Sequence, residues 1–170
     1  ALAQIENITA DNARLVSNLH ANLGGLYRMN GYPDLAREHM GKSISLLDQF
    51  NLLHINDSIP QIANYAMFLT EQQEPERGIS ELQKLSGIIK EYHSDDCLDY
   101  AKVQETLGTI YLMTANLPQA KTHFKRAFKI YEKIWADEPE MIEAKYQEIQ
   151  ELYPQIGFCI GKNLSGLLTK

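Results

Sequence analysis

The sequence predicts an all-α fold, a solenoid of antiparallel helix hairpins that follow one another along the chain. The first observation is the stretch from Gln104 to Ile134, where two helical patterns flank a tight turn and small residues stand where the helices must cross. The second is a period of about 42 residues, at which small residues recur over small ones and large apolar residues over large apolar ones. A fixed period in this range is typical of a solenoid, in which each unit buries its apolar face only against its neighbours.

Four sets of residues carry this period. They are Gly24, Ala66 and Gly108; Tyr27, Leu69 and Tyr111; Ala36, Gly78 and Ala120; and Met40, Leu82 and Phe124. Two helices approach to about 8–10 Å only where the contact residues are small. We therefore expect the small residue of each first helix to face the small residue of its partner helix, with the large side chains filling the space beside the crossing.

The first repeat is preceded by residues 1–8, which we expect to be the tail of a second helix whose partner is missing, as in an excised fragment. Asp11 is expected to cap the next helix, which runs to about Met29. Its expected buried stripe is Leu15, Leu19, Leu23, Leu26 and Tyr27. Residues 30–33 form the turn, and Pro33 stands at the start of the second helix, which runs to about Phe50.

The second and third repeats follow the same plan. Ser58 and Gln61 predict a capping box at the start of a helix that ends near residue 71. After a turn at 72–75, an apolar stripe indicates the partner helix: Ile79, Leu82, Leu85, Ile88 and Ile89. The third repeat opens around 94–96, turns at 115–118 with Asn116 as a cap, and ends near Trp135.

A fourth repeat is indicated by a capping box of Asp137 and Glu140, and Pro154 is expected to end its first helix. Residues 155–170 are apolar on several sides, so they are expected either to close this repeat or to form a homodimer surface. The predicted organisation is a single array: a tail at 1–10, repeats at 11–52, 53–94 and 95–136, and a degenerate or capping repeat at 137–170.

The third repeat resembles the tetratricopeptide repeat, through Leu107, Gly108, Tyr111, Ala120, Phe124 and Ala127. The first and second repeats carry the same signature in part, and the unit is longer than the usual repeat of that family, which has about 34 residues. It is similar to the long units of kinesin light chains and of bacterial tandem-repeat proteins. The resemblance implies a right-handed superhelix whose first helices line a concave groove, and a non-catalytic role as a scaffold that binds a protein or peptide.

The expected groove residues lie beside the packed stripes of the first helices. They are Asn18, Asn22, Arg28, Met29, Asn64, Met67, Glu71, Lys102, Glu105 and Thr109, with Thr70 and Leu112 on the same wall. Asn22 and Asn64 share one repeat position, and an amide is both donor and acceptor, so they either hold a peptide backbone or simply cap and solvate the helices. In tetratricopeptide relatives, Asn at this place holds the peptide. A ligand gripped by its C-terminal carboxylate is disfavoured, because the two cations of this wall have carboxylates nearby.

Other function classes are disfavoured by the sequence. A net charge of −6 argues against direct nucleic-acid binding, and no apolar run is long enough for a membrane. Histidines and cysteines have no metal or nucleophile spacing, so no enzyme, metal or cofactor is expected. Cys97 and Cys159 lack a CxxC pattern, which favours a cytoplasmic location. The alternative function is the sensor region of a larger bacterial regulator, either a peptide-sensing transcription factor or an ATPase-linked protein.

Overall fold

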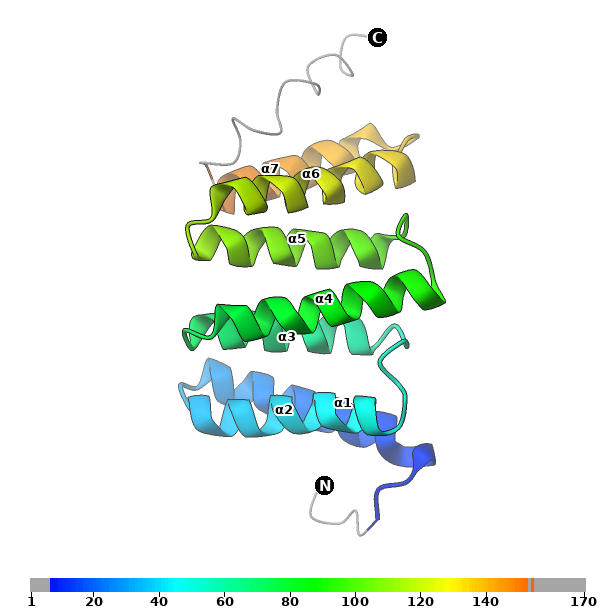
Figure 1. The fold of residues 1–170 in the computed structure, drawn as a ribbon, viewed down its shortest axis with the longest axis vertical. Helices are drawn as coiled ribbons and strands as arrows, with labels where there is room; N and C mark the ends of the chain where they lie inside the picture. The colour runs from blue at the N-terminus through cyan, green and yellow to red at the C-terminus, as the bar shows by residue number, and fades with distance from the viewer. Residues whose placement is uncertain (1–6, 153, 155–170) are drawn as a thin grey trace. The chain divides into compact units, whose positions relative to one another are not determined.

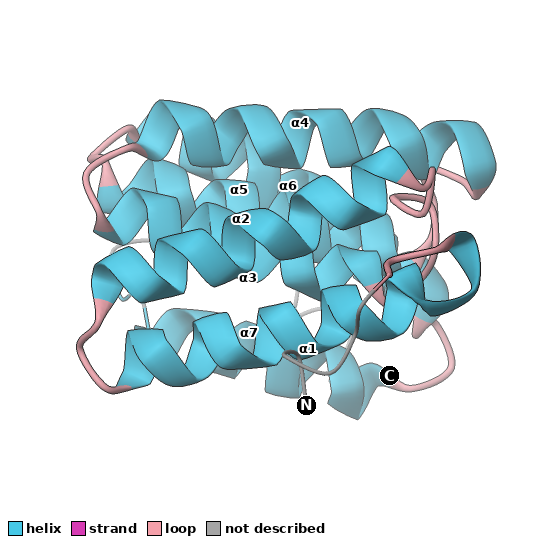
Figure 2. Ribbon diagram, turned by 90° about the horizontal axis from the view of Figure 1, so that it is seen from below, coloured by secondary structure: helices cyan, strands magenta, loops and turns pink. Residues whose placement is uncertain are grey.

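The structure, a computed structural model, describes residues 7–152 and 154, and this part of the chain is helical with no strand (Figures 1 and 2). The helices are α1 (Ala10–Met29), α2 (Pro33–Gln49), α3 (Ser58–Glu71), α4 (Pro75–Tyr92), α5 (Leu98–Met113), α6 (Leu117–Ile134) and α7 (Pro139–Leu152). They fall into two compact units, residues 1–92 with α1 to α4 and residues 93–170 with α5 to α7. The predicted all-α class and its helical hairpins are confirmed.

The turn inside each hairpin has the same backbone geometry. Gly31, Gln73 and Ala115 occupy the same position in successive repeats, and their φ angles are 77°, 63° and 58°. In each turn the N–H of the following residue donates to the carbonyl five residues earlier, at 2.9, 2.9 and 2.7 Å. This is the Schellman arrangement, in which a left-handed residue satisfies the last carbonyls of a helix. The period therefore extends to backbone conformation, even where the residue is not glycine.

The hairpin crossings of the first unit are as close as the small residues predict. A Cβ added to Gly24 would lie 2.5 Å from Cγ and 2.9 Å from the backbone N of Met40 on α2. A Cβ added to Gly78 would lie 2.5 Å from the carbonyl oxygen of Ala66 on α3. Backbone atoms occupy the space that any larger residue needs, so the two glycines are required by close approach rather than by turn geometry.

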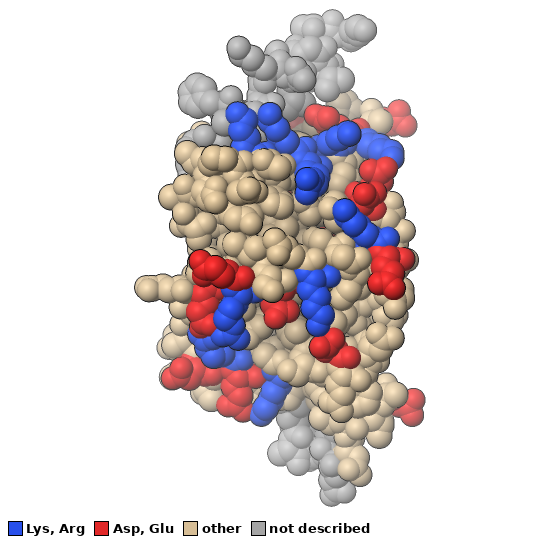
Figure 3. Space-filling model, in the orientation of Figure 1, with Lys and Arg blue, Asp and Glu red and all other residues tan. Residues whose placement is uncertain are grey.

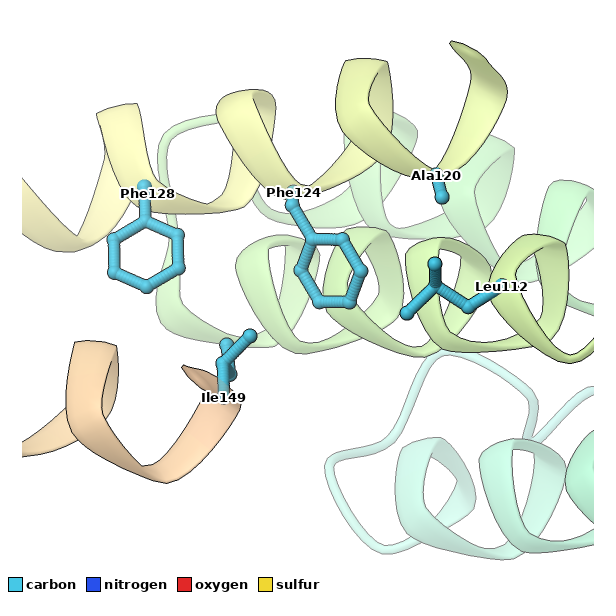
Figure 4. Close-up of a cluster of buried hydrophobic side chains, with 5 residues drawn as sticks. All are labelled: Leu112, Ala120, Phe124, Phe128 and Ile149. Atoms are coloured by element: carbon cyan, nitrogen blue, oxygen red, sulfur yellow. The ribbon is translucent and has the colours of Figure 1, made fainter. Parts of the chain in front are cut away.

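The second unit has its core where α6 meets α5 and α7. In α5, a Cβ added to Gly108 would lie 2.8 Å from the ring of Phe124, so the nearest neighbour is this ring rather than the expected alanine one turn earlier on α6. Phe124 packs with Leu112, Phe128 and Ile149 in the cluster of Figure 4. Burial of these side chains gives the short α7 its main support.

A polar contact joins the two helices of the first and third hairpins at equivalent positions. His20 Nδ1 on α1 lies 2.8 Å from His39 Nδ1 on α2. At the same positions two repeats later, Gln104 Oε1 on α5 lies 2.9 Å from His123 Nδ1 on α6. In both hairpins the second-helix histidine stacks on a tyrosine of the first helix, with 5.3 Å between ring centroids. Burial lowers the pKa of both His20 and His123. For His20, the charge of the neighbouring His39 lowers the pKa further.

The buried stripe predicted for α1 is wrong. Leu15 and Leu26 are 59% and 55% exposed, whereas the buried residues are Ala13, Val16, Ser17 and Gly24. Leucines at helical spacing identify an apolar stripe but do not say which neighbour it meets. Here the face of α1 that packs on α2 and α3 is made of smaller residues, which allow the helices to approach closely.

Two of the predicted helix starts also differ. Thr9, not Asp11, is the N-cap of α1, and its N–H is bonded to Asn12 Oδ1 at 2.8 Å. The capping box predicted from Ser58 is absent, because its hydroxyl donates to the carbonyls of Leu53 and Ile55 at 2.5 and 2.7 Å. The side chain three residues later, Gln61, is used in tertiary contacts instead.

Near α6 and α7, one expectation holds and two fail. Asn116 caps α6 as expected, accepting from the N–H of Gln119 at 3.3 Å. Because α7 begins at Pro139, Asp137 is not the residue that directly precedes it. Pro154, expected to stop this helix, is itself helical.

Within the expected N-terminal tail, residues 7 and 8 are not helical, and 1–6 lie outside the described residues. The expected closing helix or homodimer surface at 155–170 also lies outside them.

Candidate functional site

The first unit has a hollow of about 580 Å³ on the side where α1 and α3 run beside each other. Five of the expected groove residues line it: Asn18, Asn22, Arg28, Met29 and Asn64. Met40 and the buried Ser43 contribute to its lining from α2. The hollow is thus built from three helices of two adjacent hairpins.

A hydrogen-bonded network sets the floor of this hollow. Gln61 Oε1 on α3 accepts from the hydroxyls of Ser17 and Ser43 at 2.8 and 2.5 Å, and both serines are fully buried. Gln61 Nε2 donates to Asn18 Oδ1 at 2.5 Å. In the expected capping box, the Gln61 amide would lie at the surface. In the structure it is turned inward, because the buried hydroxyls of Ser17 and Ser43 require hydrogen-bond partners and the amide oxygen satisfies both. The orientation of Asn18 is fixed as a result, with its oxygen directed at α3.

Ion pairs join α1 to α3 near both ends of the hollow. Arg14 Nε donates to Asp57 Oδ2 at 2.8 Å, and this bond, with help from Asn18, lowers the pKa of the Asp57 carboxyl. Arg28 Nε donates to Glu71 Oε2, also at 2.8 Å. Each pair spans 43 residues, so adjacent first helices are linked in register. The two expected groove residues Arg28 and Glu71 therefore neutralise each other.

The amides of Asn22 and Asn64 differ from that of Asn18. Both residues are exposed and line the hollow, and neither amide makes a hydrogen bond within the described part of the chain. Met29 is 84% exposed beside them. Met67, also expected in the groove, is half-buried and does not line the hollow. The hollow thus offers two unused amides next to an exposed thioether.

A second hollow, of about 300 Å³, lies in the other unit among α5, α6 and α7. Five of its lining residues stand at the repeat positions of first-hollow residues, two repeats later: Lys102, Met141, Ala144, Lys145 and Glu148 match Asn18, Asp57, Pro60, Gln61 and Asn64. Tyr131 and Trp135 complete the lining with their rings stacked, 4.8 Å between centroids. The same position in the repeat is therefore hollow in both units, with different chemistry.

Lys145 connects the three helices of the second hollow. Its ammonium lies 2.8 Å from Glu105 and 3.1 Å from Glu148, and Tyr131 Oη donates to Glu105 Oε2 at 2.6 Å. Burial alone would lower the pKa of Lys145, but the hydrogen bonds and charges of the two glutamates outweigh it and raise that pKa. Burial and the charge of Glu105 also raise the pKa of Tyr131. Glu105, expected as a groove residue, thus serves to link helices.

Three further expectations change in the structure. Thr109 is half-buried and its hydroxyl donates to the carbonyl of Glu105 at 3.1 Å, within its own helix. Thr70 is buried and donates to the carbonyl of Ala66 at 2.9 Å, beside the α3–α4 crossing. Leu112 belongs to the core of Figure 4. Thr70 and Leu112 face the partner helix of their hairpin, because each lies one turn beyond the small residue at the helix crossing, Ala66 or Gly108.

Sequence reasoning missed most of the second hollow. Trp135 comes from the end of a second helix, where no groove residue was sought, and Met141 and Lys145 come from α7. Met141 and Lys145 lie two repeat periods after Asp57 and Gln61, but the sequence places neither of those two in the groove, so the period alone does not identify the pair. Within residues 7–152 and 154, no group of three or more His, Cys, Asp or Glu side chains could hold a metal ion. Within the same residues, no helix has both the length and the apolar character needed to cross a membrane.

The chain consists of helical hairpins that cross closely and have a residue of left-handed backbone conformation in each turn, at a constant period. These features define an all-α repeat protein. Residues 58–133 match the family model of the tetratricopeptide repeat, so this stretch carries repeats of that kind. This family generally acts through non-catalytic protein–protein interaction. Among solved structures the chain is similar to BtubC (BKLC) from P. vanneervenii, with a TM-score of 0.74 and 16% identity over 98% of this chain and 67% of that one. This likeness shows the fold alone. No curated protein matches the chain.

Proposed function

We propose that the chain binds an extended segment of a partner protein in the hollow of the first unit, without catalysis. The observation that carries the proposal is the pair Asn22 and Asn64, whose exposed amides occupy one repeat position and are unused within the described residues. A peptide backbone presents a donor and an acceptor at every residue, and an amide side chain can bond to both. Two amides at a repeat spacing suit an extended chain.

The surroundings of these amides favour binding. The network centred on Gln61 holds the floor in one arrangement, which reduces the ordering that binding would otherwise require. Met29 and Met40 supply flexible apolar contacts that adapt to different side chains. Since the charges of Arg28 and Glu71 are paired, we expect neutral or apolar ligand side chains at that end.

The proposal retains a protein or peptide partner, a cytoplasmic location and a bacterial source, as the sequence predicts. The regulatory alternative would place the same hollow in the sensor region of a larger bacterial protein. Both share the same binding chemistry, so the experiment on the hollow addresses both.

The test begins with a random-peptide phage library selected on the wild-type protein, followed by calorimetric titration of a selected peptide. The variant Asn22→Ala with Asn64→Ala should weaken binding about 10-fold, since each lost hydrogen bond contributes about 0.5–1.5 kcal/mol. The control changes two exposed amides outside the hollow, Gln49→Ala with Gln83→Ala, and should bind like the wild type. An equal loss in both variants, an unchanged affinity in the first, or failure to select any peptide would contradict the proposal.

A further inference from the structure

We infer that the exposed face of α6 is a docking surface for an acidic segment of a partner protein, separate from the two hollows. This helix has five basic residues and one acidic residue, and all six side chains are exposed: Lys121, Lys125, Arg126, Lys129, Lys133 and Glu132. Its formal charge is +4, in a chain whose net charge is −6. Figure 3 shows Lys and Arg side chains gathered over α6.

The other second helices provide an internal comparison. The helices α2, α4 and α6 begin one repeat period apart and occupy the same place in their hairpins. The helix α2 has two basic and three acidic residues, and α4 has three of each. Several of those charges are paired, as in Lys42 with Glu38 and Lys84 with Asp48. An ordinary solvated face at this position is therefore mixed in charge, and the imbalance is particular to α6.

Three of the five basic residues of α6 do little for the fold, whereas Arg126 donates to Gln104 Oε1 on α5 at 3.4 Å. Lys121, Lys125 and Lys129 are spaced four residues apart, so their charges lie on one side of the helix and repel one another. None of these three ammonium groups makes an ion pair or hydrogen bond with the described part of the chain. Lys133 differs, since it pairs with Asp96. A row of unpaired like charges lowers the stability of its own helix, and an acidic partner would remove that repulsion.

The surroundings favour a polypeptide over a nucleic acid or a membrane. The basic row is one helix wide, and α7 in the same unit has four glutamates and one lysine. The unit therefore has no broad basic surface of the kind that a long polyanion needs, whereas a row of this width suits one short acidic helix. The only large apolar side chains exposed on α6 are Leu117 and Ile134, at its two ends, so no apolar face is available to enter a bilayer. Carboxylates spaced four residues apart on a partner helix would match the lysine spacing.

The experiment measures fluorescence anisotropy of a labelled helical peptide with glutamate at every fourth position, titrated with the full chain at low and moderate salt. The test variant combines Lys121→Gln, Lys125→Gln and Lys129→Gln. The matched control combines Arg77→Gln, Lys84→Gln and Lys90→Gln on α4, and changes the net charge by the same amount. We expect affinity to fall about 10-fold or more in the test variant and less than about 2-fold in the control, with salt weakening wild-type binding.

Four results would overturn the inference. They are no binding by the wild type, no loss in the test variant, an equal loss in both variants, and tighter binding of a short DNA duplex or of phosphatidylserine vesicles than of the acidic peptide. Circular dichroism melts of both variants show whether they are folded, and the α4 variant keeps the comparison valid if the loss of charge alone changes stability. Retention of the test variant's fold together with its selective loss of peptide binding would support the surface.

Discussion

Two glycines of α4 give opposite predictions for the same substitution. A Cβ on Gly78 would lie 2.5 Å from the carbonyl oxygen of Ala66 and 3.1 Å from Thr70 Oγ1. A Cβ on Gly87 would meet nothing within 4 Å. Gly78→Ala therefore tests the close crossing of α3 and α4, and Gly87→Ala tests the intrinsic effect of adding a methyl group to the same helix.

The expected free energies follow from two opposing effects. Overpacking typically costs about 1–3 kcal/mol, and the upper part of this range applies to Gly78 because the obstacle is a backbone atom. Alanine improves helix propensity over glycine by about 1 kcal/mol. The net change is a destabilisation of about 2 kcal/mol for Gly78→Ala and a stabilisation of up to about 1 kcal/mol for Gly87→Ala, where no contact is disturbed.

Urea unfolding followed by far-ultraviolet circular dichroism, which reports the loss of helix, measures both changes. Equal slopes of the unfolding free energy against urea would show that the transitions are comparable. If Gly78→Ala unfolds at the same urea concentration as Gly87→Ala, or at a higher one, the helices do not cross at Gly78 and the hairpin register is wrong.

Two further predictions concern the turns and the histidine pair. Ala115→Gly should raise the free energy of unfolding by about 0.5 kcal/mol, because Ala115 holds the left-handed conformation that Gly31 supplies in the first turn; a lowered melting temperature would contradict this. His20→Gln introduces the residue found at Gln104 and should keep the bond to His39 while reducing the pH dependence of stability. Burial lowers the pKa of His20 in the folded state. Below about pH 6.5 the unfolded chain therefore gains a proton that the folded chain does not, and the free energy of unfolding decreases as the pH is lowered. Urea midpoints at about pH 7.5 and about pH 5.5 should therefore differ less in the variant, and an equal difference would refute the role of this histidine.

The helix positions could be predicted because their signals are local. The helix α3 ends at residue 71 as expected, and α2 begins at Pro33 and ends one residue before the expected Phe50. Proline at a helix start and the constant period are both visible in sequence. The buried side of α1 could not be predicted in this way, because Leu15 and Leu26 have helical spacing whichever neighbour the helix meets.

The lining of the first hollow could be predicted in part, because the constant period is visible in the sequence. Asn22 and Asn64 are expected in the groove because they lie beside the packed stripes and share one repeat position, and both line the first hollow. The spacing of Ser58 and Gln61 predicts a cap, because local spacing gives the same pattern for a cap and for an amide used in tertiary contacts. The actual role of Gln61 depends on Ser17 and Ser43, which are 44 and 18 residues away and become buried only when three helices assemble.

The two hollows separate the positions that build the repeat from the positions that vary its chemistry. Crossing residues and turn conformations keep their character along the chain, as Gly24 and Gly108 illustrate. Between the hollows, however, Gln61 is replaced by Lys145, and a neutral amide that satisfies two serines becomes an ammonium held by two glutamates. Both side chains join a first helix to the preceding hairpin, so the exchange changes the charge at the hollow without removing the link. The chemistry of the hollow therefore differs between the units at such positions while the packing that supports them is retained.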